Sequence, residues 1–178
     1  MRETTTKKAA KNDFFSDDEI TAIRKVVKDS RDRLLILIGM EFGMRASEVS
    51  QIEWSNFNGD QRTIRIKSKT TGIHSRYKLP SNSWNHIWKL MNELIAKHRS
   101  SSLRIFPISH RTINRKIQRY AKVAGIERPV NWHMLRRSHI LRARASGESW
   151  ESISERTGIA HLTLIKDYSP LSKEGGSS

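Results

Sequence analysis

Apolar residues recur at helical spacing along most of this 178-residue chain, and one stretch, residues 54–80, breaks that pattern. Within this stretch, apolar and polar residues alternate with period two over residues 63–67 (TIRIK). Turn signals lie on both sides of these residues, at 59–60 (GD) and at 70–72 (TTG). Together with residues 76–79, this predicts a small antiparallel sheet of two or three strands. The pattern therefore predicts a mainly α fold of the α+β class, with one small sheet.

Helix signals lie on both sides of the predicted sheet. Ser16 followed by Glu19 has the spacing of a capping box, which predicts a helix that starts at Ser16. Residues 31–42 are apolar enough for a central helix, and Gly43 is a natural helix end. Further helices are expected at residues 47–52, 84–95, 109–124, 133–145 and 150–156, with a last one that reaches Tyr168.

Net charge limits the classes of partner. Lys and Arg number 33 against 18 Asp and Glu, which gives +15 and predicts a polyanionic partner. A lipid surface also attracts cations, but no apolar run approaches the roughly 20 residues of a membrane span. The polar start has no signal peptide, and the absence of cysteine excludes disulfides and thiolate zinc sites. A cytoplasmic, nucleoid-associated protein is the simplest expectation.

The length fits one domain. Residues 1–12 read as a basic linker or tail, residues 13–170 as the folded domain, and residues 171–178 as a small polar, frayed end.

A histidine and two arginines suggest phosphate chemistry. His133 and Arg136 are three residues apart and share one helical face, where a guanidinium fork and an imidazole suit a phosphodiester. Arg45 follows Gly43 at the predicted helix end, a position that aims a side chain into a cleft, with Glu48 near enough to orient it. The simpler alternatives are a solvated helix face and a helix-end ion pair worth less than about 1 kcal/mol.

A tyrosine near the end of the chain is the remaining candidate. Tyr168 follows Asp167, and the apolar residues Leu162, Leu164 and Ile165 are expected to anchor its segment. An ordinary surface aromatic is the alternative, because the ring has an apolar body and a polar tip.

The order of these motifs resembles the tyrosine recombinase (phage integrase) family over about residues 14–170. The matching pieces are residues 43–48 (GMRASE), a lysine hairpin, residues 133–136 (HMLR) and Tyr168. The resemblance implies phosphate binding by Arg45 and Arg136, support from Glu48, proton transfer or phosphate binding by His133, and nucleophilic attack by Tyr168. The hairpin lysine has two candidates, Lys67 and Lys69. Residues 66–72 (IKSKTTG) look most like the family's hairpin if the lysine is Lys69, which would leave Lys67 as a strand residue that faces phosphate or solvent.

One position departs from the family pattern. The family usually has His or Trp nine residues before the tyrosine, where this chain has Ile159, and the nearest histidine is His161. Either His161 enters the site through an irregular backbone or the contact is absent. Other basic residues are expected to contact DNA phosphates. These are Lys67, Arg76, Lys78, Arg115, Lys116, Arg119 and Arg137.

The resemblance implies a catalytic domain that cleaves and rejoins double-stranded DNA sites through a 3′-phosphotyrosine, without metal, ATP or other cofactor. It also implies a tetramer on DNA, a monomeric isolated domain, and an N-terminal core-binding domain missing from this chain. Two alternatives stay open at this point. One is a helix-turn-helix regulator built from residues 149–168 with Gly158 at the turn. The other is a DNA-relaxing enzyme of the type IB topoisomerase kind.

Overall fold

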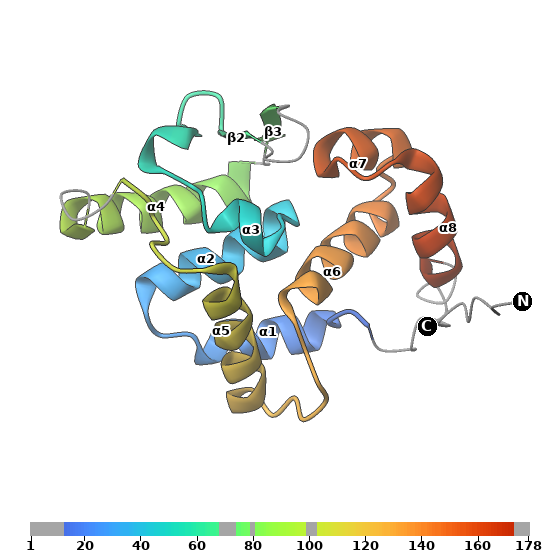
Figure 1. Ribbon diagram of the computed structural model, residues 1–178, viewed down its shortest axis with the longest axis horizontal. Coiled ribbons are helices and arrows are strands. Elements are labelled where there is room, and N and C mark those ends of the chain that lie inside the picture. The colour runs from blue at the N-terminus through green and yellow to red at the C-terminus, as the bar shows by residue number, and fades with distance from the viewer. Residues whose placement is uncertain (1–12, 68–73, 79–80, 99–102, 173–178) are drawn as a thin grey trace, which may run out of the picture.

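A computed structural model describes residues 13–67, 74–78, 81–98 and 103–172 (Figure 1). Over these residues it contains eight α-helices, one 3-10 turn (Trp54–Asn56) and three strands. The helices are α1 (Asp17–Val26), α2 (Ser30–Phe42), α3 (Ala46–Val49), α4 (Ser81–His98), α5 (His110–Val123), α6 (Trp132–Ala145), α7 (Trp150–Thr157) and α8 (His161–Ser172). The strands are β1 (Phe57–Asn58), β2 (Thr63–Lys67) and β3 (His74–Lys78). The predicted fold class, mainly α with a small antiparallel sheet, is confirmed.

The sheet has the order β1-β2-β3, and both pairings are antiparallel. Ile64 of β2 lies opposite Phe57 on one side and Tyr77 on the other, and its side chain is fully buried. Strand β3 starts two residues earlier than the period-two pattern predicted, because pairing continues to His74 opposite Lys67.

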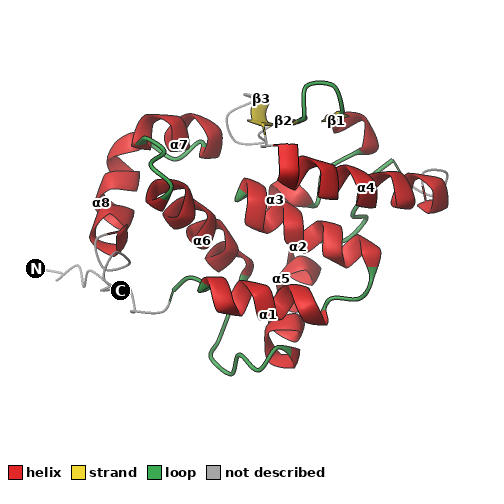
Figure 2. Cartoon of the chain, turned by 180° about the vertical axis from the view of Figure 1, so that it is seen from behind, coloured by secondary structure: helices red, strands yellow, loops and turns green. Residues whose placement is uncertain are grey.

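Two hydrophobic clusters hold the helices together. The larger one surrounds α2, whose residues from Leu34 to Met40 are all buried, and α1, α4, α5 and the start of α6 pack round it. The smaller cluster joins α6, α7 and α8 through Ile140, Ile153 and Leu164. Figure 2 shows α7 and α8 at one end of the domain and α4 at the other. No helix in the described ranges is both long and apolar enough to cross a membrane.

The crossing of α2 and α6 depends on a glycine beside a tryptophan. A Cβ atom built at Gly39 would lie 2.7 Å from the Trp132 ring, so only glycine permits this approach. The Trp132 indole Nε1 donates a hydrogen bond of 2.8 Å to the Met44 carbonyl. These contacts fix the start of α6 against the end of α2.

Several local predictions are confirmed, and those for two apolar residues of α8 are wrong. Ser16 and Glu19 form the capping box of α1, and Gly43 ends α2 in the left-handed region with φ of 62°. Helix α3 is shorter than predicted and α4 is longer. Leu162 and Ile165 do not anchor the last helix as predicted, since their side chains are 79% and 38% exposed and the buried face of α8 passes through Leu164 and Tyr168 instead.

Candidate functional site

Arg136 is the most deeply buried charged group of the site, with 1% of its surface exposed. Its Nη1 donates to the Gly43 carbonyl at 2.9 Å, and its Nη2 donates to the Thr157 carbonyl at 2.6 Å. Gly43 follows α2 and Thr157 ends α7, so both acceptors belong to helix C-termini, where carbonyls lack helical partners and the helix dipole is negative. Three helices that are distant in sequence therefore hold one guanidinium in a fixed place.

Arg45 is oriented by a carboxylate, as the sequence predicted. The Glu48 side chain accepts a bond of 2.7 Å from the Arg45 backbone N–H and one of 3.0 Å from its Nη1. Glu48 is buried, whereas 45% of the Arg45 side chain is exposed. The pair thus presents a held guanidinium to solvent, near the end of α2 that also binds Arg136.

His133 lies in the first turn of α6, three residues before Arg136, and its side chain reaches solvent. Desolvation by the surrounding protein lowers the pKa of His133 from 6.5, and the positive charges of Arg136 and Arg45 lower it further. The three predicted phosphate ligands therefore lie close enough to interact electrostatically. A neutral imidazole beside two guanidinium groups can donate a hydrogen bond to an anion or relay a proton.

Tyr168 lies beside this group but is shielded from solvent. It is 5% exposed and packs in the smaller hydrophobic cluster with Ile140, Ile153 and Leu164. Burial raises the pKa of the Tyr168 phenol, and the charge of Arg137 opposes that rise most strongly. The charge of Arg136 and a hydrogen bond from the Arg137 side chain also lower this pKa, whereas Asp167 raises it.

Arg137 has a partner far away in the sequence, Asp13. It was predicted to contact phosphate, and in the structure its Nη1 forms an ion pair with Asp13, just before α1. Next to it, the buried Ser138 hydroxyl accepts from the Phe15 backbone N–H at 2.7 Å and is 3.0 Å from the Phe15 carbonyl. The segment that enters α1 is therefore docked on α6 beside the tyrosine. More than 120 residues separate these partners, so no local sequence pattern indicates the contact.

The two candidates for the family's His or Trp position lie in different surroundings. Ile159 is partly buried and packs against the cluster that contains Tyr168. His161 begins α8, and its Nε2 lies 2.9 Å from the Glu151 carboxylate on α7. The structure thus places an apolar side chain near the tyrosine and pairs the histidine with an exposed glutamate.

The hairpin candidates are placed only in part. Lys69 lies outside the described residues. Lys67 ends β2, while Arg76 and Lys78 belong to β3, and only the backbone of these three residues is described. Strand β3 lies against α7, the helix whose last carbonyl binds Arg136, so the hairpin stands on the side of the domain that carries the site (Figure 1).

The basic residues of α5 differ from one another. Arg115 and Arg119 are exposed, as expected for groups that contact phosphates. Lys116 instead forms an ion pair of 2.7 Å with Asp32, a buried carboxylate that also accepts from the Tyr120 hydroxyl. Lys116 therefore has a structural partner, and its predicted contact with DNA stays a prediction.

Fold and site together define a mainly helical domain in which the exposed side chains of Arg45 and His133 lie near the buried guanidinium of Arg136, next to a buried tyrosine. Over the described ranges, no three His, Asp or Glu side chains cluster as metal ligands. The sequence profile described as the phage integrase family matches residues 13–174. The chain belongs to this family, as its motifs indicated.

Individual relatives and solved structures agree with this assignment. The chain is 25% identical over 148 residues to the tyrosine recombinase XerA of Saccharolobus solfataricus, an alignment that covers 83% of this chain and 45% of that protein. A crystal structure of XerA recombinase matches with a TM-score of 0.76 at 16% identity, over 93% of this chain and 65% of the other. The XerH site-specific recombinase, in a post-cleavage complex with a palindromic difH substrate, matches with a TM-score of 0.73 at 21% identity, over 91% and 50% of the two chains. The chain spans about half the length of the curated relatives it matches.

The geometry of α7 and α8 does not favour a helix-turn-helix regulator. Gly158 does end α7 in the left-handed region, as that alternative requires. However, α8 turns Leu164 and Tyr168 into the core, and its outward positions include the apolar side chains of Leu162 and Ile165. A recognition helix instead presents polar side chains to the bases of a groove. The family match likewise favours a recombinase over a type IB topoisomerase.

Proposed function

We propose that this chain is the catalytic domain of a site-specific DNA recombinase that cleaves and rejoins strands through a 3′-phosphotyrosine at Tyr168. The observation that carries the proposal is the grouping of Arg45, His133 and Arg136 at one place next to that tyrosine. The motif order that resembles the family and the family match over residues 13–174 support it.

Arg136 is suited to transition-state stabilisation because it is immobilised before any substrate arrives. Its bonds to the Gly43 and Thr157 carbonyls fix the plane of the guanidinium. Preorganised donors directed at developing charge lower a barrier by several kcal/mol in favourable cases (about 3 to 4 for one donor). Arg45, oriented by Glu48, supplies a second donor at the edge open to solvent.

The proposed step exchanges one phosphate ester for another. The Tyr168 Oη attacks the scissile phosphorus, the bond from phosphorus to the 5′ oxygen breaks, and the phenol loses its proton. Lys69 donates a proton to the departing 5′ oxygen, and His133 transfers a proton or holds the phosphate. Because the ester bond is conserved in the phosphotyrosine, attack by a 5′-hydroxyl of a second strand reverses the step without ATP.

Burial of Tyr168 means that cleavage requires a rearrangement. A phenol that is 5% exposed within an apolar cluster cannot reach a DNA backbone, so part of α8 must move away from Ile140 and Ile153 before attack. The same movement would remove the burial that raises the pKa of the phenol, and it must also open the buried Arg136 to the phosphate.

The remaining assignments also belong to this proposal. Ile159 or His161 occupies the position of the family's His or Trp. Double-stranded recombination sites are the DNA partner, and strand exchange takes place in a tetramer. The exposed residues Arg115 and Arg119, together with Lys67, Arg76, Lys78, Lys116 and Arg137, contribute salt-dependent phosphate contacts.

A suicide-substrate assay tests the nucleophile. The chain is incubated with a pool of duplexes that carry randomised half-sites and a nick in the spacer, so that cleavage releases a short fragment and traps the protein on DNA. A denaturing gel should show a covalent adduct with the native chain and none with Tyr168→Phe.

Tyr120→Phe is the matched control, because Tyr120 is a half-buried tyrosine whose hydroxyl bonds to Asp32, on another part of the domain. This variant should form the adduct. An adduct that persists in Tyr168→Phe would rule out Tyr168 as the nucleophile.

A further inference from the structure

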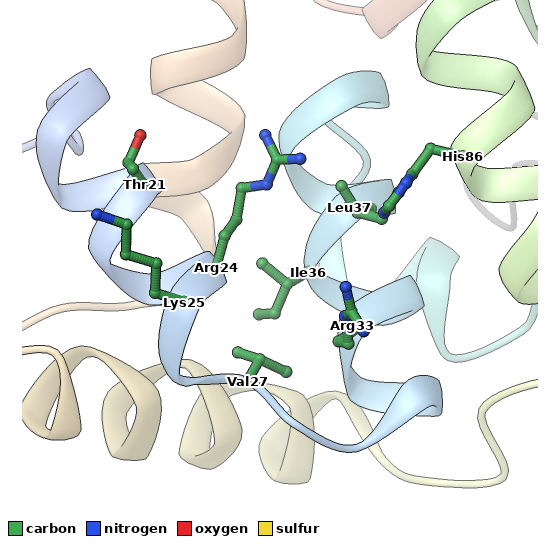
Figure 3. A pocket seen from close by; sticks show the side chains of 8 residues that line it. All are labelled: Thr21, Arg24, Lys25, Val27, Arg33, Ile36, Leu37 and His86. Carbon is green, nitrogen blue, oxygen red and sulfur yellow. The ribbon is translucent and has the colours of Figure 1, made fainter.

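A positively charged cavity lies between α1, α2 and α4, apart from the proposed cleavage site. Its volume is about 290 Å³, close to the lower end of the range for small-ligand pockets. Figure 3 shows Arg24 reaching from α1 and His86 from α4 toward the same side of α2, where Leu37 lies between them. Arg33, one turn before Leu37 on α2, completes the opening.

The two arginines and the lysine around this cavity have no ion-pair partner within the described part of the chain, and Glu41 acts electrostatically on His86. Over these residues, Arg24, Lys25 and Arg33 form no ion pair, and no Asp or Glu lines the cavity. Several other basic side chains of the domain are paired, for example Arg128 with Glu19 at 2.8 Å. Three like charges round one concavity repel one another and therefore favour an anion between them.

The floor of the cavity is apolar. Val27, Ile36 and Leu37 line it, and the Thr21 hydroxyl lies at its α1 edge. Guanidinium groups bind phosphate oxygens through paired N–H donors, and an apolar wall accepts a ring or an alkyl group. A cationic rim above such a floor suits an anion that carries an apolar portion.

The local potential at His86 agrees with this description. Partial burial lowers the pKa of His86, and the positive charges of Arg24 and Arg33 lower it further. Lys89 acts in the same direction, and Glu41 opposes these effects. An anion bound in the cavity would stabilise the imidazolium, so ligand binding should raise this pKa.

The cavity is separate from the proposed DNA-cleavage site. Its α2 residues extend from Arg33 to Leu37, whereas the cleavage site begins at Gly43, beyond the other end of that helix. Among the residues that the structure describes, none of those assigned to cleavage lines the cavity. A concave opening with an apolar floor also fits a small molecule better than the backbone of a duplex.

We propose that the cavity bounded by Arg24, Arg33 and His86 binds a small phosphate monoester whose ester group rests on Ile36 and Leu37. Such a ligand bridges α1, α2 and α4 and stabilises their packing. This site is independent of the strand-cleavage chemistry proposed above.

Calorimetric titration of the chain with phenyl phosphate, inorganic phosphate and benzyl alcohol tests this proposal. Phenyl phosphate should bind about tenfold more tightly than inorganic phosphate, because its ring buries apolar surface, and benzyl alcohol should not bind measurably. At a concentration of phenyl phosphate about one hundred times Kd, the unfolding midpoint should rise by roughly 5 to 10 °C. NMR titration should show a raised pKa for His86 in the presence of the ligand.

The double variant Arg24→Gln/Arg33→Gln should weaken phenyl phosphate binding at least tenfold, since it removes two charged donors. The double variant Arg111→Gln/Lys122→Gln is the matched control, because it removes two exposed charges of α5 away from the cavity. The control should bind as the native chain does, and equal weakening in both variants would overturn the proposal. Displacement of phenyl phosphate by a short duplex would also overturn it, because the cavity would then be part of the DNA contact surface.

Discussion

Replacement of Gly43 by alanine tests whether the end of α2 is built to hold the site. Gly43 has φ of 62°, and its carbonyl accepts the bond from Arg136 Nη1. An added Cβ would lie 2.5 Å from Cδ2 and 2.9 Å from Cγ of His139. The His139 ring cannot move aside easily, because it is buried and its Nδ1 lies 3.1 Å from the Met40 carbonyl.

Gly158→Ala is the control for this change. Gly158 ends α7 with φ of 64°, almost the same backbone conformation, but an added Cβ there would have no atom of the described residues within 4 Å. Both variants lose about 1 to 2 kcal/mol because alanine is strained in the left-handed region. Gly43→Ala loses about 1 to 3 kcal/mol more through the contact with His139.

Thermal unfolding followed by circular dichroism measures the difference. An additional 1 to 3 kcal/mol corresponds to a midpoint lower by roughly 3 to 10 °C than that of Gly158→Ala in a domain of this size. Adduct formation should also fall about tenfold or more in Gly43→Ala relative to Gly158→Ala, because the displaced carbonyl no longer aligns Arg136. Equal midpoints for the two variants would refute the reasoning that His139 closes the space beside Gly43.

Two further predictions concern α6. Ser138→Ala should lower the free energy of unfolding by about 1 to 3 kcal/mol, since it removes buried hydrogen bonds to the N-terminal segment. Asp13→Asn should lower the free energy of unfolding by less than about 1 kcal/mol, because the ion pair with Arg137 is partly exposed. Urea unfolding measures both losses of stability, and a larger loss for Asp13→Asn than for Ser138→Ala would contradict this ranking. Because the pKa of His133 is lowered from 6.5 on folding, the unfolded state binds more protons near and below that pH, and stability falls as the pH falls through about 6.5. His133→Asn should therefore show a smaller loss of stability between roughly pH 7 and pH 5 than the native chain in the same urea assay, and an unchanged loss would exclude this contribution.

Local signals in the sequence were sufficient for most of the fold. The capping box at Ser16, the glycine that ends α2 and the alternation in β2 each depend on neighbours within a few residues, and each is found as predicted. The errors at Leu162 and Ile165 have a different origin. Leu162, Leu164 and Ile165 are all apolar, and only the packing of α8 against α6 and α7 decides which of them is buried.

The candidate site was predicted as a set of residue types, but its organisation was not. A spacing of three residues places His133 and Arg136 on one face of a helix, and the resemblance to a family indicates their roles. Neither reveals that carbonyls at the ends of α2 and α7 fix Arg136, because these acceptors are backbone groups that carry no signature in the sequence.

The same contacts link the tyrosine to the rest of the domain. Arg136 donates to the last carbonyl of α7, and α8 packs on both α6 and α7. Arg137 forms an ion pair with Asp13 and lies next to Tyr168. A displacement of α8 that exposes Tyr168 therefore removes the packing of Leu164 and Ile153 while Arg136 keeps its bond to Gly43. Because Arg136 is anchored to α2 as well as to α7, the proposed phosphate-binding side of the site can stay in place while the proposed nucleophile, Tyr168, moves. A buried tyrosine beside a fixed guanidinium is thus compatible with cleavage chemistry, provided that the mobile element is α8 and not α6.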